Sequence, residues 1–246
     1  MKKGLIIGKG WLGKRLENQL EQSFQLETTR RKSDKENCIS LDFDQDISEN
    51  RTTDYDFIII TIPFGRRNSL TELSQRFQRL CQYIGAYDKQ LILLSSTAIY
   101  PDYSEGSITE TTEIISLKEP YISIEKRLKE QYSQLVILRL GGLMGDDRYM
   151  SKYIHLHHPN LTQIVNHIHY KDVCQIIERI ISIDKNDTIY HLIAPEHPTK
   201  EEVLSYQIEQ KIIQSTVRLG KVISSEKVQT ELNYTFIRPN PIYFND

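Results

Sequence analysis

The 246-residue sequence is poor in cysteine and tryptophan, and it has no long apolar run. Its three cysteines, Cys38, Cys81 and Cys174, stand singly, without the spacing of a disulfide framework or a zinc site, as expected in a reducing cytoplasm. No stretch reaches transmembrane length, and the apolar run after Met1 is too short for a signal peptide. Lys and Arg number 31 against 33 Asp and Glu, so neither nucleic acid nor a membrane is an expected partner. We therefore expect a cytoplasmic protein.

The opening of the chain carries its strongest signal. A short apolar run, Gly4–Ile7, predicts a buried strand, and it leads into the spacing Gly8, Gly10 and Gly13. In a dinucleotide site these glycines allow, in turn, a tight turn, close approach of the backbone to a pyrophosphate, and close packing of the next helix. The alternative is a bare glycine turn without a ligand. The strand before the loop and the helical spacing after it favour the dinucleotide site, whose candidate residues also include two loop neighbours, Trp11 and Leu12.

Strand-like and helix-like segments then alternate along the chain, which predicts an α/β, doubly wound parallel sheet, the Rossmann fold, with about six or seven strands. We expect a single domain, 1–246. A small integrated C-terminal substrate lobe is expected from roughly 146–168 and 195–246. The expected strands are Gly4–Ile7, Phe24–Thr28, Phe57–Ile62, Leu91–Ser95, Leu135–Leu140 and Ile189–Ala194.

The end of the second expected strand bears on the choice of cofactor. An acidic residue at this place holds the ribose 2′-hydroxyl of NAD. Here Thr29 is followed by Arg30, Arg31 and Lys32, and guanidinium groups suit a 2′-phosphate. Glu27 opposes this interpretation unless it lies inside the strand. We favour NADP over NAD as the cofactor, with a solvated basic loop as the alternative.

Other loops at the same edge of the sheet add candidates for the cofactor site. Asp42 is placed to accept from the adenine amino group, or is an ordinary loop acid. Pro63 ends the Phe57–Ile62 segment and is expected to touch the cofactor, while Phe64 is either core or a stacking surface. A phosphate contact by Arg66 or Arg67 in the next loop is a further option.

Several segments carry a resemblance to a known family. Leu94–Tyr100 reads LSSTAIY, Leu138–Gly145 reads LRLGGLMG, and Val165–Val173 reads VNHIHYKDV. With the glycine loop, these segments make the chain resemble the short-chain dehydrogenase/reductases, specifically the extended NAD-dependent epimerase/dehydratase group. The sequence GWLG at Gly10–Gly13 and the short length of the chain are similar to those of the group's atypical bacterial YeeZ-like members.

The resemblance implies an NAD(P)-binding protein, an NADP-dependent oxidoreductase or epimerase. Its substrate would be a small molecule, a sugar derivative or another carbonyl compound, and its assembly a monomer or a homodimer. In the family a Ser or Thr at a strand end orients the substrate oxygen. Four residues before Tyr100, that role falls on Ser96, with Thr97 as its nearest rival.

In the family, a tyrosine and a lysine four residues later carry out the chemistry. This chain departs from that spacing. Four residues after Tyr121 comes Glu125, and the lysine, Lys126, is one place later. On a helix one step rotates a side chain by about 100°, so Tyr121 and Lys126 would not share a face. They stay candidates for catalysis if Tyr121 precedes the first turn. Otherwise Tyr121 packs at the helix start and Lys126 is a surface residue, which would suit a non-catalytic redox sensor or scaffold.

Three further residues are candidates for contacts with the cofactor or the substrate. Leu143, after the expected strand Leu135–Leu140, is expected near the cofactor. Arg148 could hold an anionic substrate or be solvated, and His169 is either a proton donor or a structural histidine. One loop contains a cluster of three histidines, His155, His157 and His158. No carboxylate or cysteine stands at ligand spacing from it, so no metal site is expected.

Overall fold

A computed structural model of the chain describes residues 1–32, 37–47, 52–64, 69–102, 106–113 and 117–245. The chain forms two compact units, each assembled from several segments. The first comprises Met1–Ile99, Leu117–Leu138 and Ile177–Ile189. The second comprises Tyr100–Ser116, Arg139–Ile176 and Tyr190–Asp246.

The chain has a seven-stranded sheet in the order β10-β7-β5-β4-β1-β2-β3, and most of its strands belong to the first unit. Residues 139–140 of β7 and 190–192 of β10 are counted with the second unit. Strand β1 pairs in parallel with both β2 and β4, with Ile7 opposite Thr29 on one side and Ile60 on the other. The strand order reverses between β1 and β4, and ligands of such sheets bind beyond the carboxyl ends of the strands at this point. The strands are β1 (Lys3–Ile7), β2 (Gln25–Arg30), β3 (Cys38–Ser40), β4 (Phe57–Ile60), β5 (Gln90–Ser96), β7 (Val136–Leu140) and β10 (Thr188–Leu192).

The sheet confirms the predicted fold class, and each of the six expected strands is present. Several details differ from expectation. The edge strand β3 has three residues, too few to give a hydrophobic period in the sequence. Strand β4 ends at Ile60 rather than Ile62, although the N–H of Thr61 still donates to the carbonyl oxygen of Ile7 at 2.9 Å. Strand β2 continues to Arg30 rather than Thr28, and β10 ends at Leu192 rather than Ala194.

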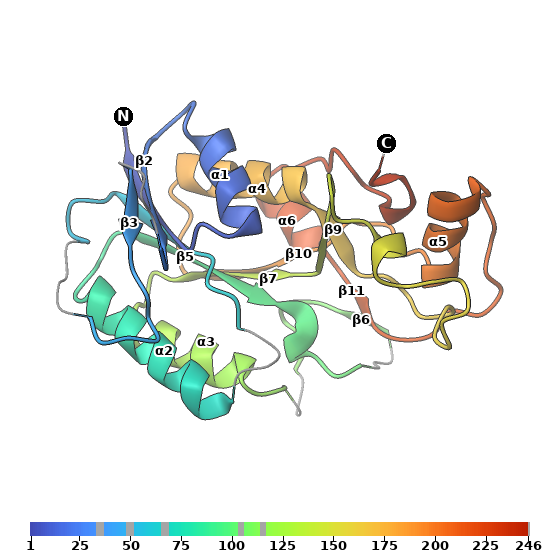
Figure 1. Cartoon of the computed structure of the whole chain (residues 1–246), viewed down its shortest axis with the longest axis horizontal. Helices are drawn as coiled ribbons and strands as arrows, with labels where there is room; N and C mark the ends of the chain where they lie inside the picture. The colour runs from blue at the N-terminus through green and yellow to red at the C-terminus, as the bar shows by residue number, and fades with distance from the viewer. Residues whose placement is uncertain (33–36, 48–51, 65–68, 103–105, 114–116, 246) are drawn as a thin grey trace. The chain divides into compact units, whose positions relative to one another are not determined.

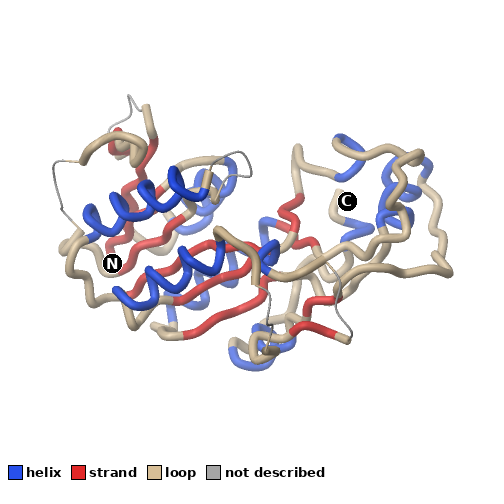
Figure 2. Tube along the Cα trace, turned by 90° about the horizontal axis from the view of Figure 1, so that it is seen from below, coloured by secondary structure: helices blue, strands red, loops and turns tan. Residues whose placement is uncertain are grey.

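Helices cover both faces of the sheet. In Figure 1, α2 and α3 lie on one face, and α1 with the C-terminal half of α4 lies on the other; Figure 2 shows the strands side by side between them. The fully buried side chains of β1 and β4 fit a sheet covered on both faces. No helix in the described part of the chain is long and apolar enough to cross a membrane. The helices are α1 (Trp11–Leu20), α2 (Leu70–Ile84), α3 (Tyr121–Gln131) and α4 (Tyr170–Ser182).

The second unit contains two short parallel strand pairs, β8 with β9 and β6 with β11. Its own apolar cluster includes Met150, Val165 and Leu204. The remaining elements are β6 (Ser107–Ile108), β8 (Gly142–Met144), β9 (His167–His169), β11 (Val222–Ile223), α5 (Lys200–Glu209), α6 (Glu226–Glu231) and three 3₁₀ turns, η1 (Thr97–Ile99) in the first unit and η2 (Met150–Lys152) and η3 (Pro241–Tyr243) in the second.

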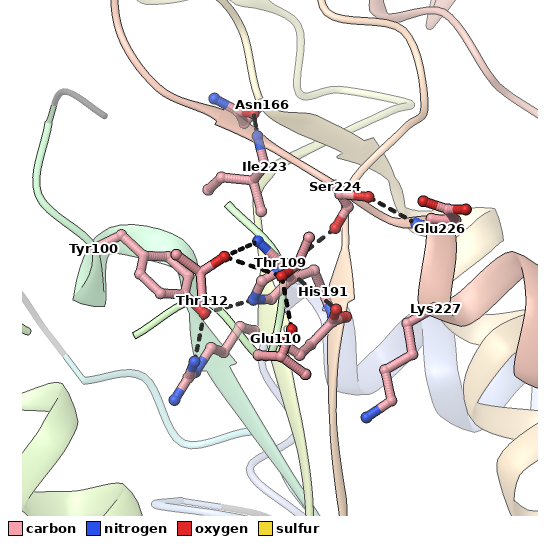
Figure 3. A network of polar contacts seen from close by, with 12 residues as sticks. Tyr100, Thr109, Glu110, Thr112, Asn166, His191, Ile223, Ser224, Glu226 and Lys227 are labelled. Carbon is pink, nitrogen blue, oxygen red and sulfur yellow. Dashed lines mark hydrogen bonds and ion pairs between the residues drawn. The ribbon is translucent and has the colours of Figure 1, made fainter. Parts of the chain in front are cut away.

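A buried chain of polar contacts crosses the second unit (Figure 3). Arg139 Nη1 donates to the hydroxyl of Tyr100, which lies 2.5 Å from His191 Nε2. His191 Nδ1 lies 3.1 Å from the carbonyl oxygen of Ser224. Because a carbonyl only accepts, Nδ1 carries the proton, and Nε2 accepts from Tyr100. Glu110 completes the network by accepting from the backbone N–H of His191 at 2.8 Å.

This network predicts an acid sensitivity. Burial lowers the pKa of His191 to about 3, from 6.5 in the unfolded chain. Between these values the unfolded state binds a proton that the folded state does not, so this contribution is fully present above pH 6.5 and is lost as the pH falls toward 3. We expect a loss of up to about 1.4 kcal/mol in unfolding free energy per pH unit.

The measurement is urea unfolding at about pH 7.5, 6 and 5 for the wild type, His191→Gln and His157→Gln. Burial raises the pKa of Glu110, which acts in the opposite direction, so the comparison between variants isolates His191. His157 is exposed and serves as the matched control. The pH slope should become shallower in His191→Gln alone. An unchanged slope in that variant would contradict the assignment.

Candidate functional site

A cavity of about 820 Å³ lies at the carboxyl edge of the first unit's sheet, at the reversal point between β1 and β4. It brings together residues from the ends of β1, β2, β3 and β4 and from helix α2. The lining residues are Gly8, Lys9, Gly10, Thr29, Arg30, Arg31, Lys32, Leu41, Asp42, Phe43, Asp44, Thr61, Ile62, Pro63 and Arg76. Seven predicted cofactor residues are among them: Gly8, Gly10, Thr29, Arg30, Arg31, Asp42 and Pro63.

The glycine loop has the close packing that its spacing predicts. Gly8 has φ +109°, and a Cβ placed on Gly13 would lie 2.4 Å from the carbonyl oxygen of Gly8. The hydroxyl of Thr61 lies 2.5 Å from that same oxygen, and the N–H of Gly8 donates to Thr29 Oγ1. Nothing lies within 4 Å of a Cβ built on Gly10, so this side of the loop has open space.

Two other predicted loop residues do not line the cavity. Leu12 is buried in the core beneath the helix. Trp11 is half-buried, with the Arg15 guanidinium 3.6 Å from the centre of its indole ring. Gly13 also acts through packing rather than by lining the cavity. These three residues therefore shape the loop and the start of α1.

The basic rim of the cavity follows β2. Arg30 is the last residue of this strand, and Arg30, Arg31 and Lys32 are exposed. Glu27 lies three residues inside the strand and is not at the rim. Its carboxylate accepts from the Tyr55 hydroxyl at 2.6 Å and pairs with the Lys3 ammonium at 2.9 Å.

Those two contacts, with that from Lys3 the larger, lower the pKa of Glu27. The carboxylate of Glu27 is therefore already paired with Tyr55 and Lys3 within the sheet. Among the lining residues, the end of β2 contributes cations and no carboxylate. This arrangement suits an anionic group more than a ribose hydroxyl.

The lining of the cavity also includes an ion pair. Asp44 accepts from Arg76 Nε at 2.8 Å and from Arg76 Nη2 at 2.9 Å, and these hydrogen bonds lower the pKa of Asp44. Asp42 Oδ1 accepts from the backbone N–H of Asp44 at 3.0 Å, which fixes the turn after β3. Lys9, Thr61 and Arg76 were not among the residues predicted for the site. A polar residue directly after a buried strand could have indicated Thr61, whereas Arg76 comes from a distant helix.

Ser96 ends strand β5 at the same edge of the sheet. Its Oγ accepts from the backbone N–H of Ala98 at 3.1 Å, while its rival Thr97 is buried in η1. The preceding residue, Ser95, is also buried and donates to Glu125 at 2.5 Å. Ser96 is thus the more accessible hydroxyl of the two candidates.

Helix α3 begins at Tyr121, so the geometry of a regular helix holds from this residue. The four-residue step from Tyr121 leads to Glu125, which is 3% exposed and faces β5, while Lys126 is exposed. The half-buried ring of Tyr121 packs against Phe64, with centroids 5.1 Å apart. The face with Tyr121 and Glu125 thus carries a carboxylate where the family pattern has an ammonium. Arg66 and Arg67 lie outside the described residues.

The remaining predicted residues lie in the second unit. Leu143 is in β8, opposite Ile168 of β9. Arg148 closes a tight turn by exchanging backbone hydrogen bonds with Gly145. His169 is 4% exposed, and burial lowers its pKa to about 4, so it is neutral near pH 7. No group of three potential metal ligands occurs within the described ranges.

The contact between Gly13 and Gly8 gives a test of the loop. Gly13→Ala would place a Cβ against backbone, so we expect it to lower the unfolding free energy by about 2–3 kcal/mol. Gly10→Ala is the matched control, since it meets open space and loses only an N-cap preference of at most about 1 kcal/mol. Chemical denaturation measures both. Equal losses would show that this contact does not constrain the loop.

Comparisons with known proteins agree with the fold. No protein-family model matches the chain. The protein YeeZ of Escherichia coli (strain K12) is 26% identical, and the match covers 98% of each chain. The human epimerase family protein SDR39U1, solved with NADPH, has a TM-score of 0.72 at 14% identity, covering 98% of this chain and 97% of that one.

A dTDP-glucose 4,6-dehydratase of Bacillus anthracis, solved with NAD, has a TM-score of 0.74 at 14% identity, covering 98% of this chain and 94% of that one. The structural matches concern the fold, and the YeeZ match concerns the sequence over nearly its whole length. Together they confirm the similarity to YeeZ, and they show that the chain shares the fold of structures of the epimerase/dehydratase group.

Proposed function

We propose that the chain binds NADP(H) at the cavity beside the glycine loop and acts as an NADP-dependent oxidoreductase or epimerase. The observation that carries the proposal is the lining of this one cavity. It combines an open glycine loop at Gly8 and Gly10 with the cationic rim at Arg30 and Arg31. Such a site suits a ligand with a pyrophosphate and a second phosphate on the adenosine ribose.

The charges at the rim support NADP rather than NAD. The position at the end of β2 is Arg30, and the nearest strand carboxylate, Glu27, is bound to Lys3 and Tyr55. Asp42 would accept from the adenine amino group, and Pro63 would lie along the cofactor. The human relative in fold was solved with NADPH, and the Bacillus anthracis dehydratase with NAD, so the fold accommodates both.

The proposed chemistry uses an active site without the tyrosine–lysine pair. Ser96 would orient a substrate oxygen, and Tyr121 or a bound water would supply the proton. Lys126 is exposed, and it is not on the face of α3 that carries Tyr121 and Glu125. Its position therefore does not support an assisting role. Leu143, Arg148 and His169 belong to the second unit, and their roles stay predictions from the sequence. In the neutral ring of His169, Nδ1 accepts from the backbone N–H of Lys171 at 3.2 Å, so Nε2 carries the hydrogen and would donate a hydrogen bond.

A second candidate function is a non-catalytic NADP-binding redox sensor or scaffold. Glu125 is the observation that favours it. A buried carboxylate one turn after Tyr121 cannot stabilise a phenolate as an ammonium does. In this alternative the cofactor is bound as a signal, and no hydride is transferred.

Nucleotide titration tests the cofactor proposal. We expect the wild type to bind NADPH more tightly than NADH. Binding is measured by the change in fluorescence of the nucleotide. The double variant Arg30→Ala/Arg31→Ala should weaken NADPH binding about tenfold or more and leave NADH unchanged, because two guanidinium contacts to a phosphate are lost. Lys171→Ala/Arg179→Ala makes the same charge change at exposed residues of α4. Failure of the wild type to bind either nucleotide at millimolar concentration would overturn the proposal.

Substitution of Tyr121 separates the enzyme from the sensor. In an NADPH-oxidation assay with a panel of small carbonyl compounds, we expect Tyr121→Phe to lower kcat about 100-fold or more, because a proton donor is removed. Lys126→Ala should retain activity, since Lys126 is exposed. Intact activity in Tyr121→Phe would exclude the tyrosine as proton donor. Tight NADPH binding without turnover of any compound would favour the sensor.

A further inference from the structure

Tyr121, the candidate proton donor, is held by its ring and not by its hydroxyl. The centroid of its ring lies 5.1 Å from that of Phe64, and the two ring planes are 33° apart. Within the described part of the chain, the Tyr121 hydroxyl makes no hydrogen bond. By contrast, Tyr55 donates to Glu27, and Tyr132 donates to backbone carbonyl oxygens. The direction of the Tyr121 hydroxyl therefore depends on how its ring is packed.

Phe64 is well placed to fix that ring, because it is itself packed on another side. Its side chain is 7% exposed, and its centroid lies 5.3 Å from that of Phe77 in α2, which is fully buried. Figure 1 shows α2 and α3 on the same face of the sheet. The three rings thus run from the core to the start of α3. A closely packed core side chain keeps one low-energy rotamer, so Phe64 presents a constant surface to Tyr121.

The backbone links Phe64 to the cavity beside the glycine loop. Thr61, directly after β4, is tied to this loop because its hydroxyl lies 2.5 Å from the carbonyl oxygen of Gly8. Pro63 lines the cavity, and its ring restricts the backbone just before Phe64. The short segment after β4 therefore connects the proposed cofactor site with the ring that packs on Tyr121.

We propose that Phe64 is a positioning residue, whose ring holds Tyr121 in the orientation from which its hydroxyl donates a proton to the substrate oxygen. This inference rests on the proposed function. A proton donor must come within hydrogen-bond reach of its acceptor, and a displacement of about 1 Å can lower a rate about 100-fold. A hydroxyl that no protein group binds is available to a substrate, but only its ring keeps it in place. Phe64 takes no part in bond making.

The test is a double-mutant cycle on kcat in the NADPH-oxidation assay with small carbonyl compounds. Phe64→Leu keeps an apolar side chain and removes the ring, and we expect it to lower kcat about tenfold, because the Tyr121 hydroxyl is less well oriented. In Tyr121→Phe the same substitution should change kcat less than about twofold, since no hydroxyl is left to orient. The Kd of NADPH should stay within about twofold of the wild type in all variants.

Phe24→Leu is the matched control for the loss of a packed ring. Phe24 is 8% exposed, and its centroid also lies 5.1 Å from that of an aromatic neighbour, Phe57. Phe24 directly precedes β2 and Phe57 begins β4, so this pair lies at the amino edge of the sheet, away from Tyr121. We expect both leucine variants to lower the thermal midpoint, and Phe64→Leu alone to lower kcat.

Several outcomes would overturn the inference while the proposed cofactor site stands. An equal loss of kcat from Phe64→Leu in the wild type and in Tyr121→Phe would show that Phe64 does not act through the tyrosine. An equal loss in Phe24→Leu would assign the effect to packing in general, and weaker NADPH binding in Phe64→Leu would assign it to the cofactor.

Other outcomes reach further than Phe64. If Tyr121→Phe keeps full activity, or if the wild type binds NADPH and converts no carbonyl compound, the role of Tyr121 fails and this inference fails with it. If the wild type binds no nucleotide at all, the proposed function fails as well.

Discussion

The contact between Gly13 and the carbonyl oxygen of Gly8 is the constraint on which the candidate site depends. It lets α1 begin directly above the end of β1, at the place where the strand order reverses. Thr61, at the end of β4, closes the same contact from the neighbouring strand through its hydroxyl. The loop is therefore held by α1 and by the end of β4, while the space at Gly10 is open.

The cations around this loop are of two kinds, those paired with a carboxylate and those exposed at the rim. Lys9 and Arg76 have carboxylate partners within the first unit, whereas the exposed cations at the end of β2 form the rim. Glu27 is held inside its strand by Lys3 and Tyr55. The positive charge available to a ligand in the cavity thus depends on which carboxylates are already paired, more than on the number of basic residues. This is the physical basis of the proposal that the site binds an adenosine with a 2′-phosphate.

The edge of the sheet at Ser96 and Tyr121 departs from the pattern of the family that the chain resembles, for a reason found in α3. The helix begins at Tyr121, so helical geometry places Glu125, and not Lys126, on the same face. Glu125 is buried and accepts from Ser95, which ties α3 to the end of β5. A carboxylate at this position serves the packing of the sheet edge, and any proton transfer must proceed without an ammonium beside the tyrosine.

The sequence by itself determined the alternation of strands and helices, the glycine loop and the basic rim, because each depends on residues close together in the chain. Burial on both faces makes the inner strands apolar throughout, and the strand-to-helix turn needs glycine at fixed spacings. Only the tertiary structure decided the edge strand β3, the pairing of Lys9 with Glu17, the place of Arg76 and the buried state of Glu125. These depend on packing between elements, and on which partner each charge meets, and neither leaves a periodic signal in the sequence.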